Sequence, residues 1–290
     1  MARKPRIIGP QLYHHIYAWG NDHHPIFKNK SNHEMYLNLL PMYASQNQID
    51  VIAYALMGSH VHLFVFDAAG KLSNFMNNLH GSYAQYFNTT LKRVGHVFGE
   101  RFNSKVVQFN NYGVWLSRYI HRQPIEAGLV KDPRRFSWTS YRAYLGLEKK
   151  DFLQTEIILS QFGLGKIALL RYEDFVLGKQ DDQVKWDTNT ISVIGDNTFV
   201  EHFNTVSTGI VKRLVDKPIG EDLIKITANH FKCKLEILMN PIGREERKLR
   251  HRAFDYLVNE HGLSARHVSR LFNVTPKAVV KSIRCTARTT

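Results

Sequence analysis

The chain has 290 residues, which is enough for about two ordinary domains that each bury a hydrophobic core. It carries 39 Lys and Arg against 25 Asp and Glu, a formal net charge of +14 at pH 7. Two cysteines are too few for a disulfide framework or a four-cysteine zinc site, and no apolar run approaches the ~20 residues of a membrane helix. We therefore expect a soluble cytoplasmic protein with no membrane association.

The basic residues gather in the last third of the chain. From Gly209 onward there are 17 basic and 8 acidic residues. Such a surplus is typical of proteins that bind a polyanion, and nucleic acid is the usual one. The alternative is a basic surface that only keeps the protein soluble. We expect nucleic acid, and with it association with the nucleoid.

The residue pattern up to about residue 127 alternates between strand and helix signals. Dense β-branched and aromatic stretches indicate strands, and apolar residues at helical spacing indicate helices. The predicted strands are 6–19, 50–55, 60–66 and 97–109, and the predicted helices are 32–48, 72–94 and 114–127. This order predicts an α+β fold with helices on one face of an antiparallel sheet.

The remainder of the chain is predicted to be mostly helical. Residues 137–145 look extended, and 156–176 look helical. Further helices are predicted at about 200–215, 219–230, 234–239, 244–260 and 264–285. Three parts follow: an α+β domain over 1–178, a linker or connecting segment over 179–207, and an all-α domain over 208–290.

A His-Val-His motif lies in the predicted strand 60–66. Side chains two apart on a strand point to the same face, so His60 and His62 can share one metal ion. The alternative is two histidines on an exposed face. Spacing alone does not separate these readings.

Tyr119 and Gln123 are four residues apart on a predicted helix and so share one face. A tyrosine hydroxyl can act as a nucleophile, and an amide oxygen can bind a hard metal ion. Arg118 and Arg122 make the surroundings electropositive, which suits a phosphate. Without other information, an ordinary buried tyrosine is the better reading of Tyr119.

Three stretches together resemble a known family. They are YALMGSHVHLFV, GHVFGERFNS, and SRYIHRQPIEAGLV followed by SWTSYRAYLG. In this order they resemble the single-tyrosine HUH transposases of the REP-associated tyrosine transposase type, which are IS200-like. The resemblance covers about residues 6–178 and implies a ferredoxin-like or RRM-like nuclease domain. Ser59 and Trp19 depart from the family, which usually has Asn and Arg at these places.

The resemblance implies a role for each of these residues. His60, His62 and Gln123 would bind a divalent metal, Mg²⁺ or Mn²⁺, because imidazole suits Mn²⁺ and oxygen ligands suit Mg²⁺. Tyr119 would attack the DNA backbone and form a 5′-phosphotyrosine. The basic residues nearby would hold the DNA strand; they are Arg101, Lys105, Arg118 and Arg122.

The C-terminal part, about residues 219–285, resembles the helix-turn-helix domain of the replication initiator DnaA. Leu271 and Phe272 lie on the apolar face of one helix, and Thr275 begins the next. The alternative is a plain three-helix bundle. The resemblance implies binding of duplex DNA, and the residues expected to contact it are Arg244, Arg247, Lys248, Thr275, Lys277 and Lys281.

Together these features predict a transposase and single-strand DNA endonuclease, active as a monomer or homodimer. It would cleave and rejoin single-stranded DNA at hairpin or palindromic elements and bind duplex DNA through its C-terminal domain. A non-catalytic DNA-binding regulator and an RNA-binding protein are the alternatives.

Overall fold

The computed structural model describes residues 6–178, 192–207, 219–259 and 265–286. The chain divides into two compact units, Met1–Thr155 with Leu169–Val211 and Glu156–Ala168 with Lys212–Thr290. The division differs from the predicted boundary at 178, because residues 156–168 belong to the C-terminal unit. Within that unit, Gln161 Nε2 donates a hydrogen bond to Asn259 Oδ1 at 3.3 Å.

The first unit is built on a five-stranded sheet with the strand order β2-β3-β1-β4-β5. The strands are β1 (Leu12–Trp19), β2 (Ile49–Leu56), β3 (His60–Asp67), β4 (Asn103–Val107) and β5 (Val193–Ile194). The first four pair antiparallel, and β5 pairs parallel to β4. The predicted α+β class is confirmed.

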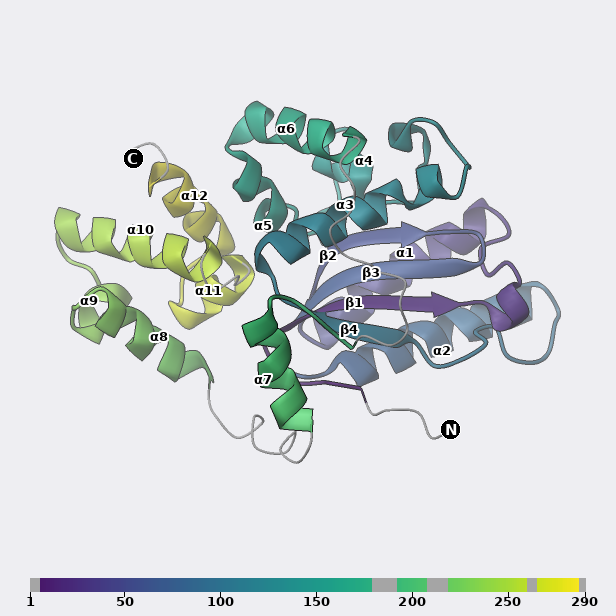
Figure 1. Ribbon diagram of the computed structural model, residues 1–290, viewed down its shortest axis with the longest axis horizontal. Coiled ribbons are helices and arrows are strands. Elements are labelled where there is room, and N and C mark those ends of the chain that lie inside the picture. Colours follow the sequence, from purple (N-terminus) through teal and green to yellow (C-terminus); the bar gives the residue numbers. More distant parts are fainter. Residues whose placement is uncertain (1–5, 179–191, 208–218, 260–264, 287–290) are drawn as a thin grey trace. The chain divides into compact units, whose positions relative to one another are not determined.

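Helices cover both faces of this sheet (Figure 1). On one face Val61, Leu63 and Val65 share a hydrophobic core with α1 (Lys30–Gln46) and α2 (Leu72–Thr90). On the other face α3 (Asn110–Glu126) packs against β2 and β3. The prediction placed helices on one face only. The difference arises because both alternating sets of β3 residues are buried, the polar ones included.

Part of the predicted linker is folded onto the sheet. Val193 pairs with Val106 at the β4 edge, and α7 (Asn197–Ser207) follows directly. The Gln108 side chain donates to Asp196 Oδ2 at 2.8 Å and fixes this connection. A two-residue strand is too short to give a periodic signal in the sequence. Residues 179–191 of the predicted linker lie outside the described residues.

The outer side of α3 is held by α4 (Tyr141–Tyr144) and α6 (Gly165–Leu177). His121 is fully buried there, and both its ring nitrogens lie 2.7 Å from a hydroxyl, Nδ1 from Tyr172 and Nε2 from Ser140. Ser140 Oγ in turn accepts the backbone N–H of Tyr54 in β2 at 2.9 Å. The network therefore ties α3 to both α6 and the sheet.

The second unit is helical. Its helices are α5 (Glu156–Leu159), α8 (Ile219–His230), α9 (Leu235–Met239), α10 (Arg244–Asn259), α11 (Ala265–Leu271) and α12 (Pro276–Thr286). A short turn joins α11 to α12, in which Asn273 adopts a left-handed conformation with φ 51°. Phe272 packs against Phe254 of α10 with the ring centroids 5.0 Å apart. One side of α12, which carries Lys277 and Lys281, is exposed.

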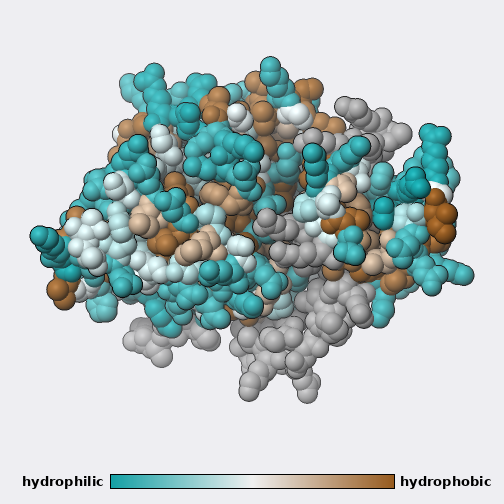
Figure 2. Space-filling model, turned by 180° about the vertical axis from the view of Figure 1, so that it is seen from behind, coloured by the Kyte–Doolittle hydropathy of each residue, from teal (hydrophilic) through white to brown (hydrophobic). Residues whose placement is uncertain are grey.

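The face of the molecule seen in Figure 2 shows mostly hydrophilic residues, with hydrophobic ones in small separate groups. None of the helices in the described ranges is long and apolar enough to cross a membrane.

A buried histidine on β1 gives a stability prediction. His14 is fully buried, and within the described part of the chain neither ring nitrogen has a hydrogen-bond partner. A desolvated polar group without a hydrogen bond is destabilising, so His14→Leu should raise the free energy of unfolding by about 1–2 kcal/mol. Urea denaturation measures the change.

The control is His121→Leu, which removes an imidazole that makes two hydrogen bonds. It should lower the free energy of unfolding by about 1–3 kcal/mol. A destabilised His14→Leu variant would contradict the prediction.

Candidate active site

The register of β1 and β3 gathers aromatic and imidazole rings on the face that α3 covers. Tyr17 pairs with His62 and Trp19 pairs with His60, so all four side chains share this face. The imidazole centroids of His60 and His62 lie 5.1 Å apart, and the rings are nearly perpendicular at 87°. The predicted pair is thus brought together on one face.

The Nδ1 atom of each imidazole lies within hydrogen-bond distance of a neighbouring side chain. Ser59 Oγ lies 3.3 Å from His60 Nδ1, and His15 Nε2 lies 3.1 Å from His62 Nδ1. The ε nitrogens are therefore the ones suited to bind a ligand outside this hydrogen-bond network.

His15 is a residue of the site that the sequence did not single out, and Lys105, which the sequence suggested only as a basic residue for holding DNA, lies beside it. They are paired across β1 and β4, and both are buried. The ring of His15 stacks on that of His62 with the centroids 5.4 Å apart. Side chains alternate along β1, so His15, Tyr17 and Trp19 share one face. Only the pairing of β1 with β3 places them beside His60 and His62 on that face.

Burial favours the neutral form of the His15 and His62 imidazoles. Burial and the nearby charge of Lys105 lower the pKa of His15 to about 3. Burial, the neighbouring His15 and His60, and Lys105 hold the pKa of His62 well below its usual range. A neutral imidazole is the form that binds a metal ion.

Tyr119 projects from α3 toward these histidines. Its ring lies edge-on to His62 at a centroid distance of 5.6 Å and edge-on to His15 at 5.7 Å. Gln123 follows one helical turn later, and its amide nitrogen donates to the Tyr119 carbonyl at 3.5 Å. The amide oxygen is thus the atom of Gln123 that remains suited to bind a cation. The structure brings the predicted nucleophile next to the histidine pair.

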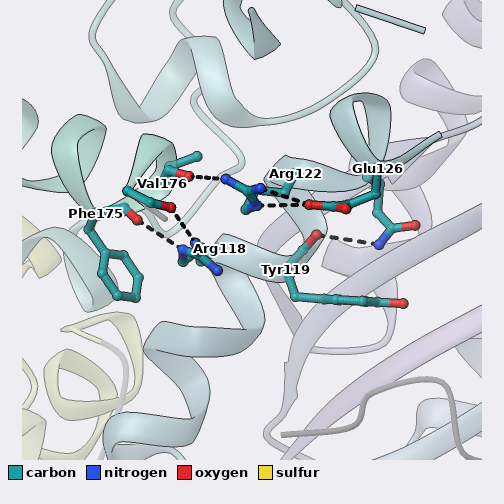
Figure 3. A network of polar contacts seen from close by, with 8 residues as sticks. Arg118, Tyr119, Arg122, Glu126, Phe175 and Val176 are labelled. Atoms are coloured by element: carbon teal, nitrogen blue, oxygen red, sulfur yellow. Dashed lines mark hydrogen bonds and ion pairs between the residues drawn. The ribbon is translucent and has the colours of Figure 1, made fainter. Parts of the chain in front are cut away.

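Arg118 and Arg122 lie on either side of Tyr119 along the chain and hold the C-terminal end of α6 (Figure 3). Arg118 is buried and donates to the carbonyls of Phe175 at 2.9 Å and Gly178 at 2.7 Å. Arg122 donates to the carbonyl of Val176 at 2.9 Å and forms an ion pair with Glu126. Carbonyls at a helix end lack partners within the helix, so both arginines cap α6. The structure gives both arginines this anchoring role, and the DNA contacts predicted for them from the sequence stay a prediction.

The predicted DNA-contact residues of the second unit lie on two helices. Thr275 Oγ1 accepts the backbone N–H of Ala278 at 3.2 Å and so begins α12. Lys277 and Lys281 are exposed one turn apart on that helix. The others, Arg244, Arg247 and Lys248, lie in the first turns of α10.

By their chemistry, the imidazoles of His60 and His62 and the amide oxygen of Gln123 suit a divalent metal ion. In the described ranges, no group of three or more His, Cys, Asp or Glu is placed to hold a metal. A metal here would therefore depend on two neutral imidazoles and an amide oxygen, His60, His62 and Gln123. Borderline ions such as Mn²⁺ accept this mixture of nitrogen and oxygen ligands.

Comparisons with known proteins give matches for part of the chain. Residues 10–123 match the family model described as "Transposase IS200 like", which is less than half of the chain. A search of curated proteins gave no match.

Two solved structures are also similar. One is a REP-associated tyrosine transposase bound to a REP hairpin, 10% identical, with a TM-score of 0.43, covering 52% of this chain and 96% of that one. The other is a candidate transposase from Deinococcus radiodurans R1, 18% identical, with a TM-score of 0.30, covering 42% and 98%. The stretch that matches the family model contains His60, His62, Tyr119 and Gln123, so all four candidate site residues lie within the part that resembles IS200-like transposases.

Proposed function

We propose that the first unit is a metal-dependent tyrosine transposase that cleaves and rejoins single-stranded DNA. One observation carries the proposal: the Tyr119 ring lies against the His62 ring, on the sheet face that also bears His60. The family match over residues 10–123 supports it. The substrate would be a hairpin or palindromic element, in which the scissile strand is unpaired.

The chemistry of this arrangement is a transesterification. Tyr119 Oη attacks the phosphorus, the bond from phosphorus to the 3′ oxygen breaks, and the tyrosine is left joined to the 5′ phosphate. The phenol loses its proton, and the departing 3′ oxygen gains one. The 3′ hydroxyl can later attack the phosphotyrosine and restore the phosphodiester without ATP, because the number of phosphoester bonds is unchanged.

His60, His62 and Gln123 would hold Mg²⁺ or Mn²⁺ beside the scissile phosphate. A bound metal supplies charge neutralisation on the non-bridging oxygens as the phosphorus is attacked. The protein orients the donors for this: the caps made by Arg118 and Arg122 anchor α3, and the strand register fixes the imidazoles.

The experiment mixes the full-length protein with 5′- and 3′-labelled single-stranded hairpin DNA and analyses it on a denaturing gel. The proposal predicts a covalent protein–DNA adduct that carries the 3′ label and not the 5′ label. The adduct should not form in excess chelator, and adding Mn²⁺ should restore it. DNA binding without any adduct would instead favour a non-catalytic regulator. Preference for single-stranded RNA over DNA would favour an RNA-binding protein.

His15 gives a further test of the site. To bind a metal through Nε2, His62 must donate its Nδ1 proton, and His15 Nε2 at 3.1 Å is the acceptor. His15→Leu should therefore weaken Mn²⁺ binding by about 10–100-fold. Calorimetric titration with Mn²⁺ measures this without DNA. His15→Gln keeps an acceptor and is the control. Equal affinities of the wild type and His15→Leu would exclude the role.

We further propose that the second unit binds duplex DNA through α12. Its exposed Lys277 and Lys281 lie opposite the buried Val279 and Ile283, as a helix that enters a groove requires. The basic residues of α10, Arg244, Arg247 and Lys248, would contact phosphates, although Lys248 also pairs with Glu245 at 2.6 Å.

The affinity for duplex DNA should fall steeply with salt, with a slope of about −0.9 for each phosphate contact. Lys277→Ala should weaken binding by about 1–3 kcal/mol if the side chain reaches a base edge, and the loss would then depend on sequence. A fluorescence titration over several salt concentrations measures both effects. Exposed Lys232 offers the matched control, because it lies outside α10 and α12. Salt-independent binding, or equal effects of Lys277→Ala and Lys232→Ala, would contradict the assignment.

A further inference from the structure

A cleft of about 420 Å³ lies directly beside the histidine pair. Its walls come from the end of β1, the short helix η1 (Asn21–His23) and the segment 99–103. Tyr17 and Trp19 line the cleft and also contact the imidazoles, Tyr17 near His62 and Trp19 near His60. The cleft and the candidate active site therefore share two aromatic residues.

Trp19 is a fixed aromatic platform in this cleft. Its ring centroid lies 4.0 Å from that of His60, and the side chain is still 38% exposed. The backbone around it is held on both sides, because its carbonyl accepts the N–H of Gly99 at 3.1 Å and the next residue, Gly20, donates to Ser59 at 2.7 Å. A large aromatic ring that is both exposed and rigidly placed suits a flat ligand.

The turn that closes the cleft is built under strain. A Cβ at Gly20 would collide with the carbonyl oxygen of His24, so only glycine fits there. Asp22 and His23 both adopt left-handed backbone conformations, with φ of 50° and 56°. Such conformations cost free energy and are found preferentially at ligand sites.

The charges of the cleft favour a base over a phosphate. Asp22 and Glu100 place carboxylates in its wall, which repel a phosphate but can accept hydrogen bonds from the amino group of a base. Arg101 lies at the same cleft and is exposed, so it can contact the phosphate that follows. The predicted DNA contact of Arg101 thus fits the rim of this cleft.

We propose that this cleft binds an unpaired nucleobase of the DNA strand, stacked on Trp19, next to the scissile phosphate. The inference rests on the proposed function and adds a subsite to it. It assigns Trp19, which departs from the Arg usual in the resembling family, a role in selecting single-stranded over paired DNA. In a duplex the base would stay stacked on its neighbours and could not enter the cleft.

The test compares two single strands of equal length, oligodeoxyadenylate and an abasic strand, binding to the full-length protein in excess chelator. Chelator removes any effect of Trp19 on metal binding through His60. Trp19→Ala should weaken binding of oligodeoxyadenylate by about 5- to 150-fold and leave binding of the abasic strand unchanged. Trp19→Phe keeps a ring and should restore most of the affinity. Leu147→Ala, an exposed apolar residue outside the cleft, is the matched control and should change neither affinity.

Each other outcome overturns the inference in a recognisable way. Equal losses for both strands would show that Trp19 acts on phosphate contacts or on the fold, and unchanged affinity for both would show that no base stacks on it. In either case the tyrosine chemistry would stand, because the adduct assay on hairpin DNA with Mn²⁺ tests it separately. A wild-type protein that binds neither strand would overturn the inference, and the absence of any adduct on hairpin DNA with Mn²⁺ would then overturn the proposed function as well.

Discussion

Tyr119→Phe should abolish cleavage of single-stranded DNA, with a fall in rate of about 10⁴-fold or more, because the variant lacks the attacking oxygen. The phenyl ring keeps its edge contacts with His62 and His15, so the fold and DNA binding should be retained. The measurement is single-turnover cleavage of a labelled hairpin strand, with binding measured in parallel.

The matched control is Tyr112→Phe, which changes a second tyrosine at the start of the same helix. It should cleave at close to the wild-type rate. If Tyr119→Phe still cleaves while Tyr112→Phe does not, the nucleophile has been assigned to the wrong tyrosine.

Acid should unfold the first unit at a pH where its carboxylates are still ionised. Burial lowers the pKa of His14 and of His121 to about 3, against about 6.5 in the unfolded chain. The native state thus binds fewer protons than the unfolded state between these values. The contribution of these neutral histidines to the free energy of unfolding is fully present above pH 6.5 and is lost as the pH falls toward 3.

Below pH 6, His14 and His121 together make the free energy of unfolding fall by about 2.7 kcal/mol for each pH unit. By pH 5 the loss should reach about 4 kcal/mol, a large share of the ~5–15 kcal/mol that holds a typical domain together. Urea titrations at about pH 7.5, 6 and 5, followed by near-ultraviolet circular dichroism, measure this loss of unfolding free energy. His14→Leu should reduce the slope by about 1.4 kcal/mol per pH unit, the contribution of one histidine. An unfolding free energy that does not change from neutral pH to pH 5 would contradict the burial of both imidazoles as neutral groups.

Local patterns in the sequence were enough to predict the core of the first unit. The dense β-branched and aromatic residues around His60 and His62 predicted β3 to within one residue of its observed bounds, and the predicted helix 114–127 covers most of α3. Local residue composition and helical spacing were enough to indicate these two elements. The pairing of His60 with His62 needs only the period of two along one strand.

Features that depend on contacts between distant segments were not predictable in this way. His15 joins the site only through the register of β1 on β3, and Lys105 only through that of β4 on β1. Arg118 looked like a phosphate ligand in the sequence, but its hydrogen bonds go to carbonyls about sixty residues away. The strand at Val193 exists because the β4 edge is open to it. In each case the decisive partner is far away in the chain.

The central claim is that Tyr119 forms the covalent bond to DNA, and peptide mapping tests it most directly. The wild-type protein is allowed to react with a single-stranded hairpin and is then denatured, digested with protease and nuclease, and analysed by mass spectrometry. We predict one modified peptide, with the nucleotide attached through its 5′ phosphate to Tyr119 of α3. A nucleotide attached to Tyr112 or to any other residue, or cleaved DNA without a modified peptide, would contradict the account.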